Sequence, residues 1–182
     1  LGFESLWDHF FFNFKMTEID LSQYTIINKI GSGSFGDVFY VKDIKTDQTY
    51  AAKVMKYEEE IENSRNILFI LREINIMAAL IHQAIIRYVG FSLHDFNGLP
   101  NPTIILEYAP NGTLKNIIKS EISGLSHKYW DDTKKLICIY GIASGMSFLH
   151  QHKIIHRDLK LENILMDEYL LPKISDFGLS KI

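Results

Sequence analysis

The segment that most constrains this chain reads His-Arg-Asp-Leu-Lys-Leu-Glu-Asn over residues 156–163, and Asp-Phe-Gly follows it from Asp176. Asp158 can accept a hydrogen bond from a hydroxyl group and take its proton. Lys160 can neutralise charge on a phosphoryl group in transfer. Asn163 and Asp176 offer amide and carboxylate oxygens, which are hard ligands suited to Mg²⁺. The alternative is a polar loop followed by an acidic turn, and the ordered spacing of these elements argues against it.

A second segment, residues 31–38, reads Gly-Ser-Gly-Ser-Phe-Gly-Asp-Val. A Gly-x-Gly-x-x-Gly pattern is a weak signal alone, because a tight hairpin explains it equally well. A dinucleotide site would need a helix after the glycines, whereas a strand-like stretch follows here. A hairpin free of bulky side chains can close over phosphates and offer them backbone N–H groups.

Lys53 follows Ala51 and Ala52 in a strand-like stretch, at the spacing expected if this strand floors a nucleotide pocket. A lysine there can reach phosphate oxygens, but it needs a carboxylate to hold it. Glu73, in the helical pattern that follows, is the candidate partner. Taken separately, each residue is better explained as part of a solvated face, so the pair is plausible only jointly.

Together these strings resemble the protein-kinase signature set: glycine-rich loop, Ala-x-Lys lysine, helix glutamate, H-R-D-L-x-x-x-N loop and D-F-G triplet. The resemblance runs from about Tyr24 to Ile182. Lys160 favours a serine/threonine kinase over a tyrosine kinase. Residues 145–150, Gly-Met-Ser-Phe-Leu-His, are similar to the tyrosine-kinase-like group. The resemblance implies transfer of the γ-phosphoryl group of ATP, with Mg²⁺, to serine or threonine hydroxyls of a protein substrate.

The resemblance also assigns roles to individual positions. It implies that Leu106 is the gatekeeper beside adenine and that backbone groups of Glu107 and Ala109 bind the base. For the apolar positions, plain core packing is an alternative that is also compatible with the kinase interpretation. The implied catalytic residues are Asp158, Lys160, Asn163, Lys53 and Glu73, and the implied metal ligands are Asn163 and Asp176. The implied nucleotide contacts are Ile30, Gly31, Ser32, Gly33, Ser34, Phe35, Gly36, Val38, Ala51, Lys53, Leu106, Glu107, Ala109, Leu165 and Asp176. The implied regulatory column is Met77, Tyr88, His156 and Phe177.

The hydrophobic periodicity predicts an α+β chain with a β-rich part before a helical part. The predicted strands are 24–30, 37–41, 49–55, 85–93 and 103–107, with short extended pieces at 163–166 and 173–175. The predicted helices are 61–80, 113–119 and 131–150, and 120–129 is a predicted loop. With the resemblance, this becomes a bilobal protein-kinase-like fold. Its predicted parts are an N-terminal extension of unknown role (1–20), an antiparallel N-lobe with one helix and the hinge (21–109), and a partial helical C-lobe (110–182).

The composition of the 182 residues is that of an ordinary globular protein, with 47% hydrophobic and 23% charged residues. The formal net charge of −3 argues against nucleic acid as the main ligand. No run of residues is long and apolar enough to predict a membrane span. The single cysteine, Cys138, excludes an intrachain disulfide and suits a reducing compartment, so we predict a cytoplasmic protein.

The sequence stops at Ile182, whereas the resemblance implies an activation segment and further helices. We therefore expect a truncated kinase in which the apolar face of 131–150 is exposed and could be covered by a partner. The alternative is a catalytically inactive fragment that acts only as a nucleotide- or partner-binding module. Phosphate transfer that is lost in Asp158→Ala would separate the two hypotheses.

Overall fold

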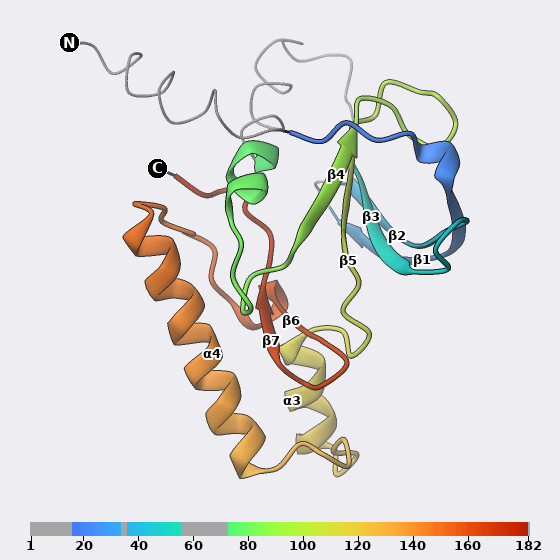
Figure 1. Cartoon of the computed structure of the whole chain (residues 1–182). Coiled ribbons are helices and arrows are strands. Elements are labelled where there is room, and N and C mark those ends of the chain that lie inside the picture. The colour runs from blue at the N-terminus through green and yellow to red at the C-terminus, as the bar shows by residue number, and fades with distance from the viewer. Residues whose placement is uncertain (1–15, 34–35, 56–72, 182) are drawn as a thin grey trace, which may run out of the picture. The chain divides into compact units, whose positions relative to one another are not determined.

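The computed structural model describes residues 16–33, 36–55 and 73–181 (Figure 1). The chain divides into two compact units. The first runs to Leu80 and includes Tyr88–Glu107, and the second comprises Ile81–Arg87 and Tyr108–Ile182. The sequence did not lead us to expect that Ile81–Arg87 would belong with the helical part. Within 16–33, 36–55 and 73–181, no helix has the length and apolar character needed to cross a membrane.

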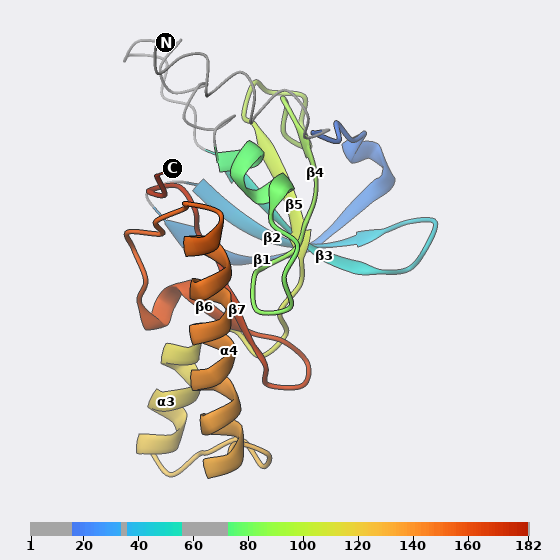
Figure 2. The ribbon, with the colours of Figure 1, turned by 60° about the vertical axis from the view of Figure 1, so that its left-hand side comes forward.

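The described residues of the first unit form a five-stranded antiparallel sheet with one α-helix against it, and the α+β expectation is confirmed. The helix is described over residues 73–79, and the earlier part of the predicted helix lies outside the described residues. Figure 2 shows this helix, in green, beside β4 and β5. The 3₁₀ helix η1 (Leu21–Gln23) leads into the sheet. The strands of the sheet are β1 (Tyr24–Gly33), β2 (Gly36–Asp43), β3 (Thr49–Met55), β4 (Tyr88–Ser92) and β5 (Thr103–Glu107). They lie in the order β1-β2-β3-β5-β4.

The strand predicted at 85–93 was wrong at both ends, because β4 begins at Tyr88 and ends at Ser92. Ile85 instead forms an isolated bridge with Ile174, and the Ile86 N–H donates to the Ile174 carbonyl at 2.9 Å. Both isoleucines are buried. An apolar run predicts burial but does not tell which element will cover it. The pairing of Ile85 and Ile86 with Ile174 could therefore not be predicted from the sequence.

The two faces of the sheet carry separate cores. On one face, η1 contributes Leu21 to a cluster from β2, β3 and β5. On the other face, Ile74 of the helix joins residues of β3, β4 and β5. Side chains alternate between faces along a strand, so Lys53 lies on the face covered by the helix, directly opposite Ile104. The first cluster consists of Leu21, Val41, Ala52 and Ile105, and the second of Met55, Ile74, Phe91 and Ile104.

The second unit contains two longer helices, α3 (Leu114–Ile122) and α4 (Asp132–Gln151), with the 3₁₀ helix η2 (Leu161–Asn163) and the hairpin of β6 (Ile164–Met166) and β7 (Pro172–Ile174). Side chains cap both helices, as is usual for threonine and aspartate. Thr113 Oγ1 accepts the Asn116 N–H at 3.2 Å, and Asp131 Oδ1 accepts the Lys134 N–H at 2.8 Å.

The loop predicted from residue 120 begins later, because α3 continues to Ile122. Gly124, with φ of +73°, lies just beyond the helix, as expected for a glycine that ends one. The loop was predicted from residue 120 because the sequence becomes polar there, but polar residues do not by themselves end a helix.

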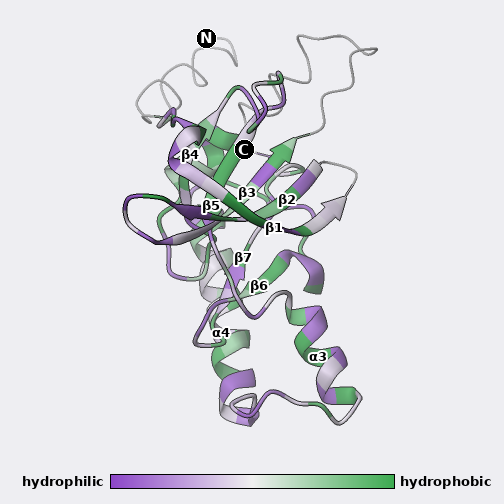
Figure 3. Cartoon of the chain, turned by 90° about the vertical axis from the view of Figure 1, so that its right-hand side faces the viewer, coloured by the Kyte–Doolittle hydropathy of each residue, from purple (hydrophilic) through white to green (hydrophobic). Residues whose placement is uncertain are grey.

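The apolar residues of α4 occupy more than one face, so the single predicted face was too simple. Cys138, Gly145 and Leu149 are buried, whereas Leu136 and Tyr140 are 68% and 72% exposed. Hydrophobic residues of α4, green in Figure 3, thus occupy exposed as well as buried positions. The expected exposed apolar surface is present, and a partner that covers it stays a prediction.

Replacing Gly141 of α4 by alanine should lower the free energy of unfolding. A Cβ atom at this position would lie 2.6 Å from Cγ of Pro172, whose ring cannot rotate away. Overpacking costs about 1–3 kcal/mol, which exceeds the roughly 0.5–1 kcal/mol that alanine gains over glycine in a helix. Urea unfolding measures the change. Ser147→Ala, at an exposed position of the same helix, is the matched control and should not destabilise the protein; equal midpoints for the two variants would contradict the close approach.

Candidate active site

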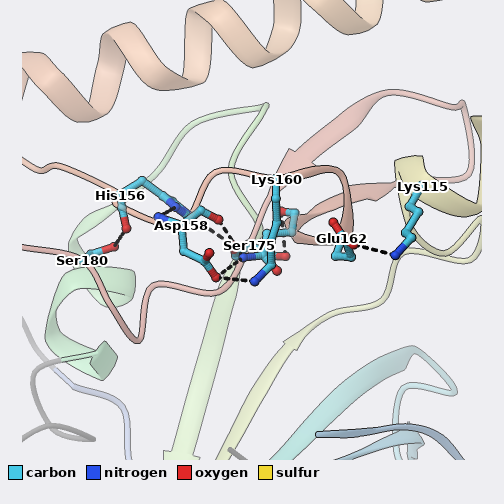
Figure 4. Close-up of polar contacts among 8 residues, drawn as sticks. Lys115, His156, Asp158, Lys160, Glu162, Ser175 and Ser180 are labelled. Atoms are coloured by element: carbon cyan, nitrogen blue, oxygen red, sulfur yellow. Dashed lines mark hydrogen bonds and ion pairs between the residues drawn. The ribbon is translucent and has the colours of Figure 1, made fainter. Parts of the chain in front are cut away.

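The segment 154–163 forms the loop that carries three of the predicted catalytic residues, Asp158, Lys160 and Asn163. The segment follows the C-terminal end of α4, where the Ile154 N–H donates to the Leu149 carbonyl at 2.9 Å. Arg157 has φ of +65°, a value that few residues other than glycine adopt. The Asp158 N–H donates to Nδ1 of His156 at 3.4 Å. The backbone therefore turns sharply just before Asp158, which presents its carboxylate beside Lys160 (Figure 4).

Asn163 holds Asp158 in place. Its side-chain Nδ2 donates to the backbone carbonyl of Asp158 at 2.8 Å and to Oδ2 of the same residue at 2.9 Å. Asn163 is buried at the end of η2. Since Nδ2 makes both contacts, Oδ1 is the atom of this amide with the chemistry to bind a cation.

Lys160 forms an ion pair with the Asp158 carboxylate. Its Nζ lies 2.7 Å from Oδ2 of Asp158. The hydrogen bond from Lys160 is the largest of the effects that lower the pKa of Asp158; desolvation opposes it and the Asn163 amide adds to it. The same bond raises the pKa of Lys160. Asp158 is therefore an ionised acceptor and Lys160 a cation at neutral pH.

Asp176 is attached to the same framework through its neighbour Ser175. The Ser175 N–H and Oγ–H both donate to the Asn163 carbonyl, at 2.9 and 3.0 Å. Asp176 itself has φ of +65°, a backbone conformation that aspartate tolerates better than most residues. These contacts place the segments that carry Asn163 and Asp176 next to each other.

An amide oxygen and a carboxylate on adjacent segments fit Mg²⁺, which usually takes one or two protein ligands and completes its shell with water and phosphate. Residues 16–33, 36–55 and 73–181 contain no group of three or more histidine, cysteine, aspartate or glutamate side chains that could hold a metal. The mixed pair of Asn163 and Asp176 as ligands of the ion stays a prediction.

His156 and Phe177 form the buried support of this region. Both are nearly inaccessible to solvent, and their rings meet edge to face with centroids 5.1 Å apart. His156 Nε2–H donates to the Ser175 carbonyl at 3.0 Å, and the Ser180 hydroxyl donates to the His156 carbonyl at 3.3 Å. Burial is the largest cause of the lowered pKa of His156. The neutral imidazole therefore connects the loop to Ser175, the residue between β7 and Asp176.

In the first unit, Lys53 and Glu73 form the expected ion pair. Lys53 Nζ lies 2.8 Å from Oε1 of Glu73, and the side chains are only 15% and 7% exposed. Removal of either side chain would leave the other charge buried and unpaired, which is strongly destabilising. Its role in binding phosphate stays a prediction.

The glycine-rich segment is the hairpin between β1 and β2. Gly33 pairs with Gly36 at its end, and Ser34 and Phe35 lie outside the described residues. Gly36 has φ of +144°, and a Cβ atom there would lie 2.1 Å from the Val54 carbonyl oxygen, so only glycine fits. Ser32 Oγ donates to Oδ1 of Asp37 at 2.7 Å.

The sheet register brings several predicted nucleotide contacts of the first unit onto the face of Lys53. Val38 lies opposite Lys53, and Ala51 lies opposite Leu106. Ile30 near the end of β1 is 43% exposed. Glu107 pairs with Tyr50 at the end of β5.

The remaining two predicted contacts belong to the second unit. The Ala109 carbonyl accepts the Gly112 N–H at 3.3 Å. Leu165, in β6, pairs with Lys173 of β7 and forms an isolated bridge with Thr113. The part that these residues play in binding adenine stays a prediction.

Two features of the site were missed from the sequence. Ser175 connects the segments that carry the two predicted metal ligands through its contacts with the Asn163 carbonyl. A contact to a backbone carbonyl leaves no sequence signal. Lys115 of α3 lies 2.6 Å from Glu162, one residue before Asn163. A charge pair so far apart in the chain is not predictable from local spacing.

Residues 24–182 match the family "Protein kinase domain". The chain belongs to the protein kinase family. It is 32% identical over 182 residues to cysteine-rich receptor-like protein kinase 27 of Arabidopsis thaliana, covering 98% of this chain and 26% of that protein. It is 30% identical over 166 residues to the serine/threonine-protein kinase STY17 of the same plant (91% and 27%). It is 31% identical over 160 residues to an Aurora kinase of Patiria pectinifera (88% and 37%). The chain thus spans about a quarter to just over a third of the length of these relatives.

Protonation of His156 should destabilise the protein below neutral pH. Burial lowers the pKa of His156 in the folded state below the ordinary histidine pKa of about 6.5. The unfolded chain therefore binds the proton more readily, and stability is lost as pH falls from about 6.5 towards the folded-state pKa. Urea midpoints at pH 7.5 and 5.5 measure this loss. His156→Gln should show a smaller difference between the two pH values than the native protein. An equal difference would contradict the assignment to His156.

Proposed function

We propose that this chain transfers the γ-phosphoryl group of ATP to serine or threonine hydroxyls of a protein substrate. The observation that carries the proposal is the Asp158 carboxylate, fixed by Asn163 at 2.9 Å and Lys160 at 2.7 Å. Such a carboxylate is an ionised acceptor with one orientation, which suits it to receive the proton of an attacking hydroxyl. Membership of the protein kinase family supports the same chemistry.

The first unit supplies nucleotide-binding groups in this proposal. Backbone N–H groups of the glycine hairpin bind phosphate oxygens, and Lys53 binds them with its ammonium group. Glu73 keeps that ammonium oriented and charged. Val38, Ala51 and Leu106, which lie on the Lys53 face of the sheet, contact the adenine ring. Kinase-family resemblance assigns hinge contacts to Glu107 and Ala109 and further nucleotide contacts to Ile30 and Leu165.

The second unit supplies the groups for the transfer step. Asp158 accepts the hydroxyl proton, so the oxygen gains nucleophilic character while its bond to phosphorus forms and the bond from the γ-phosphorus to ADP breaks. Lys160 offsets negative charge near the acceptor oxygen. Asn163 Oδ1 and the Asp176 carboxylate hold Mg²⁺, which when bound neutralises charge on the phosphates.

The substrate class rests on two supports. Lys160, two residues after Asp158, favours serine and threonine over tyrosine. The relative STY17 is named a serine/threonine-protein kinase. The cytoplasmic location stays a prediction that rests on the single cysteine.

Asp158→Asn should abolish phosphate transfer without unfolding the chain. The amide has the same shape but cannot take a proton, and loss of a general base costs about 10²- to 10⁴-fold in rate. Transfer from γ-labelled ATP to a serine-containing generic acceptor measures this. Glu168→Gln, an exposed position outside the site, is the control and should keep the native rate. A folded native chain that binds Mg-ATP without transferring phosphate would instead be a binding module.

Asp176→Asn should raise the Mg²⁺ concentration needed for ATP-dependent thermal stabilisation by roughly tenfold or more, in the range found when metal-site groups are altered. Asparagine also tolerates the positive φ of this residue, so the backbone should be kept while one negative ligand is lost. Thermal shift in a Mg²⁺ titration at fixed ATP gives the midpoint. An unchanged midpoint would remove Asp176 from the proposed metal ligands.

A further inference from the structure

Residues 16–20, here called the N-terminal strap, extend the sheet of the first unit along the free side of β4. Glu18 forms a parallel bridge with Phe91. The Ile19 N–H donates to the Phe91 carbonyl at 2.8 Å, and the Phe91 N–H donates to the Thr17 carbonyl at 2.9 Å. The β4 strand is outermost in the sheet, and an outer strand exposes a row of backbone groups that needs partners. The strap supplies them.

Gly90 makes room for the strap. A Cβ atom at this position of β4 would lie 2.5 Å from Cγ2 of Ile19 and 3.0 Å from the Thr17 carbonyl oxygen. Gly90 is buried. Its φ lies outside the left-handed region, so its backbone conformation does not by itself require glycine. A glycine in a strand costs entropy and packs no side chain. Its place here is explained by the close approach of the strap.

The strap contacts both cores of the unit. Ile19 packs against the cluster that includes Leu21 and Ile105, and Met16 packs against the cluster of Met55, Ile74, Phe91 and Ile104. Alternating strap residues thus reach opposite faces, as an added strand requires. The strap is therefore part of the packing of the sheet as well as a partner for its edge.

The contact of Met16 connects the strap to the proposed nucleotide site. Ile74, in the cluster that Met16 covers, is fully buried and is the immediate neighbour of Glu73. Glu73 Oε1 lies 2.8 Å from Lys53 Nζ. The same cluster contains Met55, two residues after Lys53 and on the same face of β3. Both members of the ion pair are thus flanked by residues that the strap helps to pack.

We propose that the N-terminal strap is a positioning element for the Lys53–Glu73 pair. It fixes the β4 edge at Gly90, and Met16 supports the cluster through which Ile74 of the helix packs on the sheet. The proposal rests on the proposed function, in which this pair orients the nucleotide phosphates. A loosened strap lets the helix over 73–79 shift on the sheet, so that Glu73 holds Lys53 less often.

Two variants of the full chain test the strap by different means. Gly90→Ala displaces the strap sterically. Met16→Ala leaves the backbone hydrogen bonds of the strap and removes only its packing on the cluster that includes Ile74. Glu18→Ala is the matched control, because this strap residue is exposed and its bridge is made by the backbone. Both test variants should lower kcat/KM for Mg-ATP by roughly 2- to 30-fold, the size of coupling expected through packed side chains, and the control should not.

Amide hydrogen exchange provides a readout that needs no activity. In both test variants, amides of 73–79 should exchange faster, while those of α4 in the second unit should keep their native rates. Faster exchange with unchanged kcat/KM, or native exchange at 73–79 in both variants, would overturn the proposal. If Gly90→Ala unfolds the unit, Met16→Ala decides alone. A native chain without transfer activity would count against the proposed function, and the exchange rates would still decide whether the strap holds the helix.

Discussion

The hydrogen bonds of Asn163 are the interaction on which the second unit depends. The side chain fixes Asp158 through two bonds from Nδ2, and the backbone carbonyl receives both donors of Ser175. One buried residue therefore connects the loop that holds the proposed base with the segment that holds Asp176. Buried polar groups stabilise a single arrangement only when their partners are all in place. Positive φ values at Arg157 and Asp176 persist because this network determines the backbone on either side of them.

The first unit depends on a comparable arrangement around Lys53. Strand alternation places Lys53 among apolar side chains on the face that the helix covers, and Glu73 supplies the charge that such a position requires. The hairpin glycine Gly36 and the strand glycine Gly90 each permit a close backbone approach that a Cβ atom would prevent. The two units thus use different means, a polar network and a packed sheet, to hold charged groups in defined orientations.

The sequence predicted most of what depends on local pattern. The bounds of β3 and β5 were predicted as found. The two helices predicted from residues 113 and 131 are α3 and α4, and Thr113 and Asp131 cap them. The Lys53–Glu73 contact was expected because a lysine that reaches phosphate oxygens needs a carboxylate to hold it. Contacts to backbone atoms were not predictable, since the Ser175 link to Asn163 and the strap on Phe91 involve carbonyls that any residue carries. The burial of Ile85 and Ile86 was predictable, but not the element that covers them.

The central claim is that Asn163 holds the Asp158 loop and the Asp176 segment together before any ligand binds. The most direct test is amide hydrogen exchange at Ser175 in the ligand-free chain, because its N–H donates to the Asn163 carbonyl at 2.9 Å. We predict slow exchange, similar to that of Ile174 in β7, and little further slowing when Mg-ATP is added. Fast exchange without ligand, with protection gained only when Mg-ATP is present, would contradict the claim.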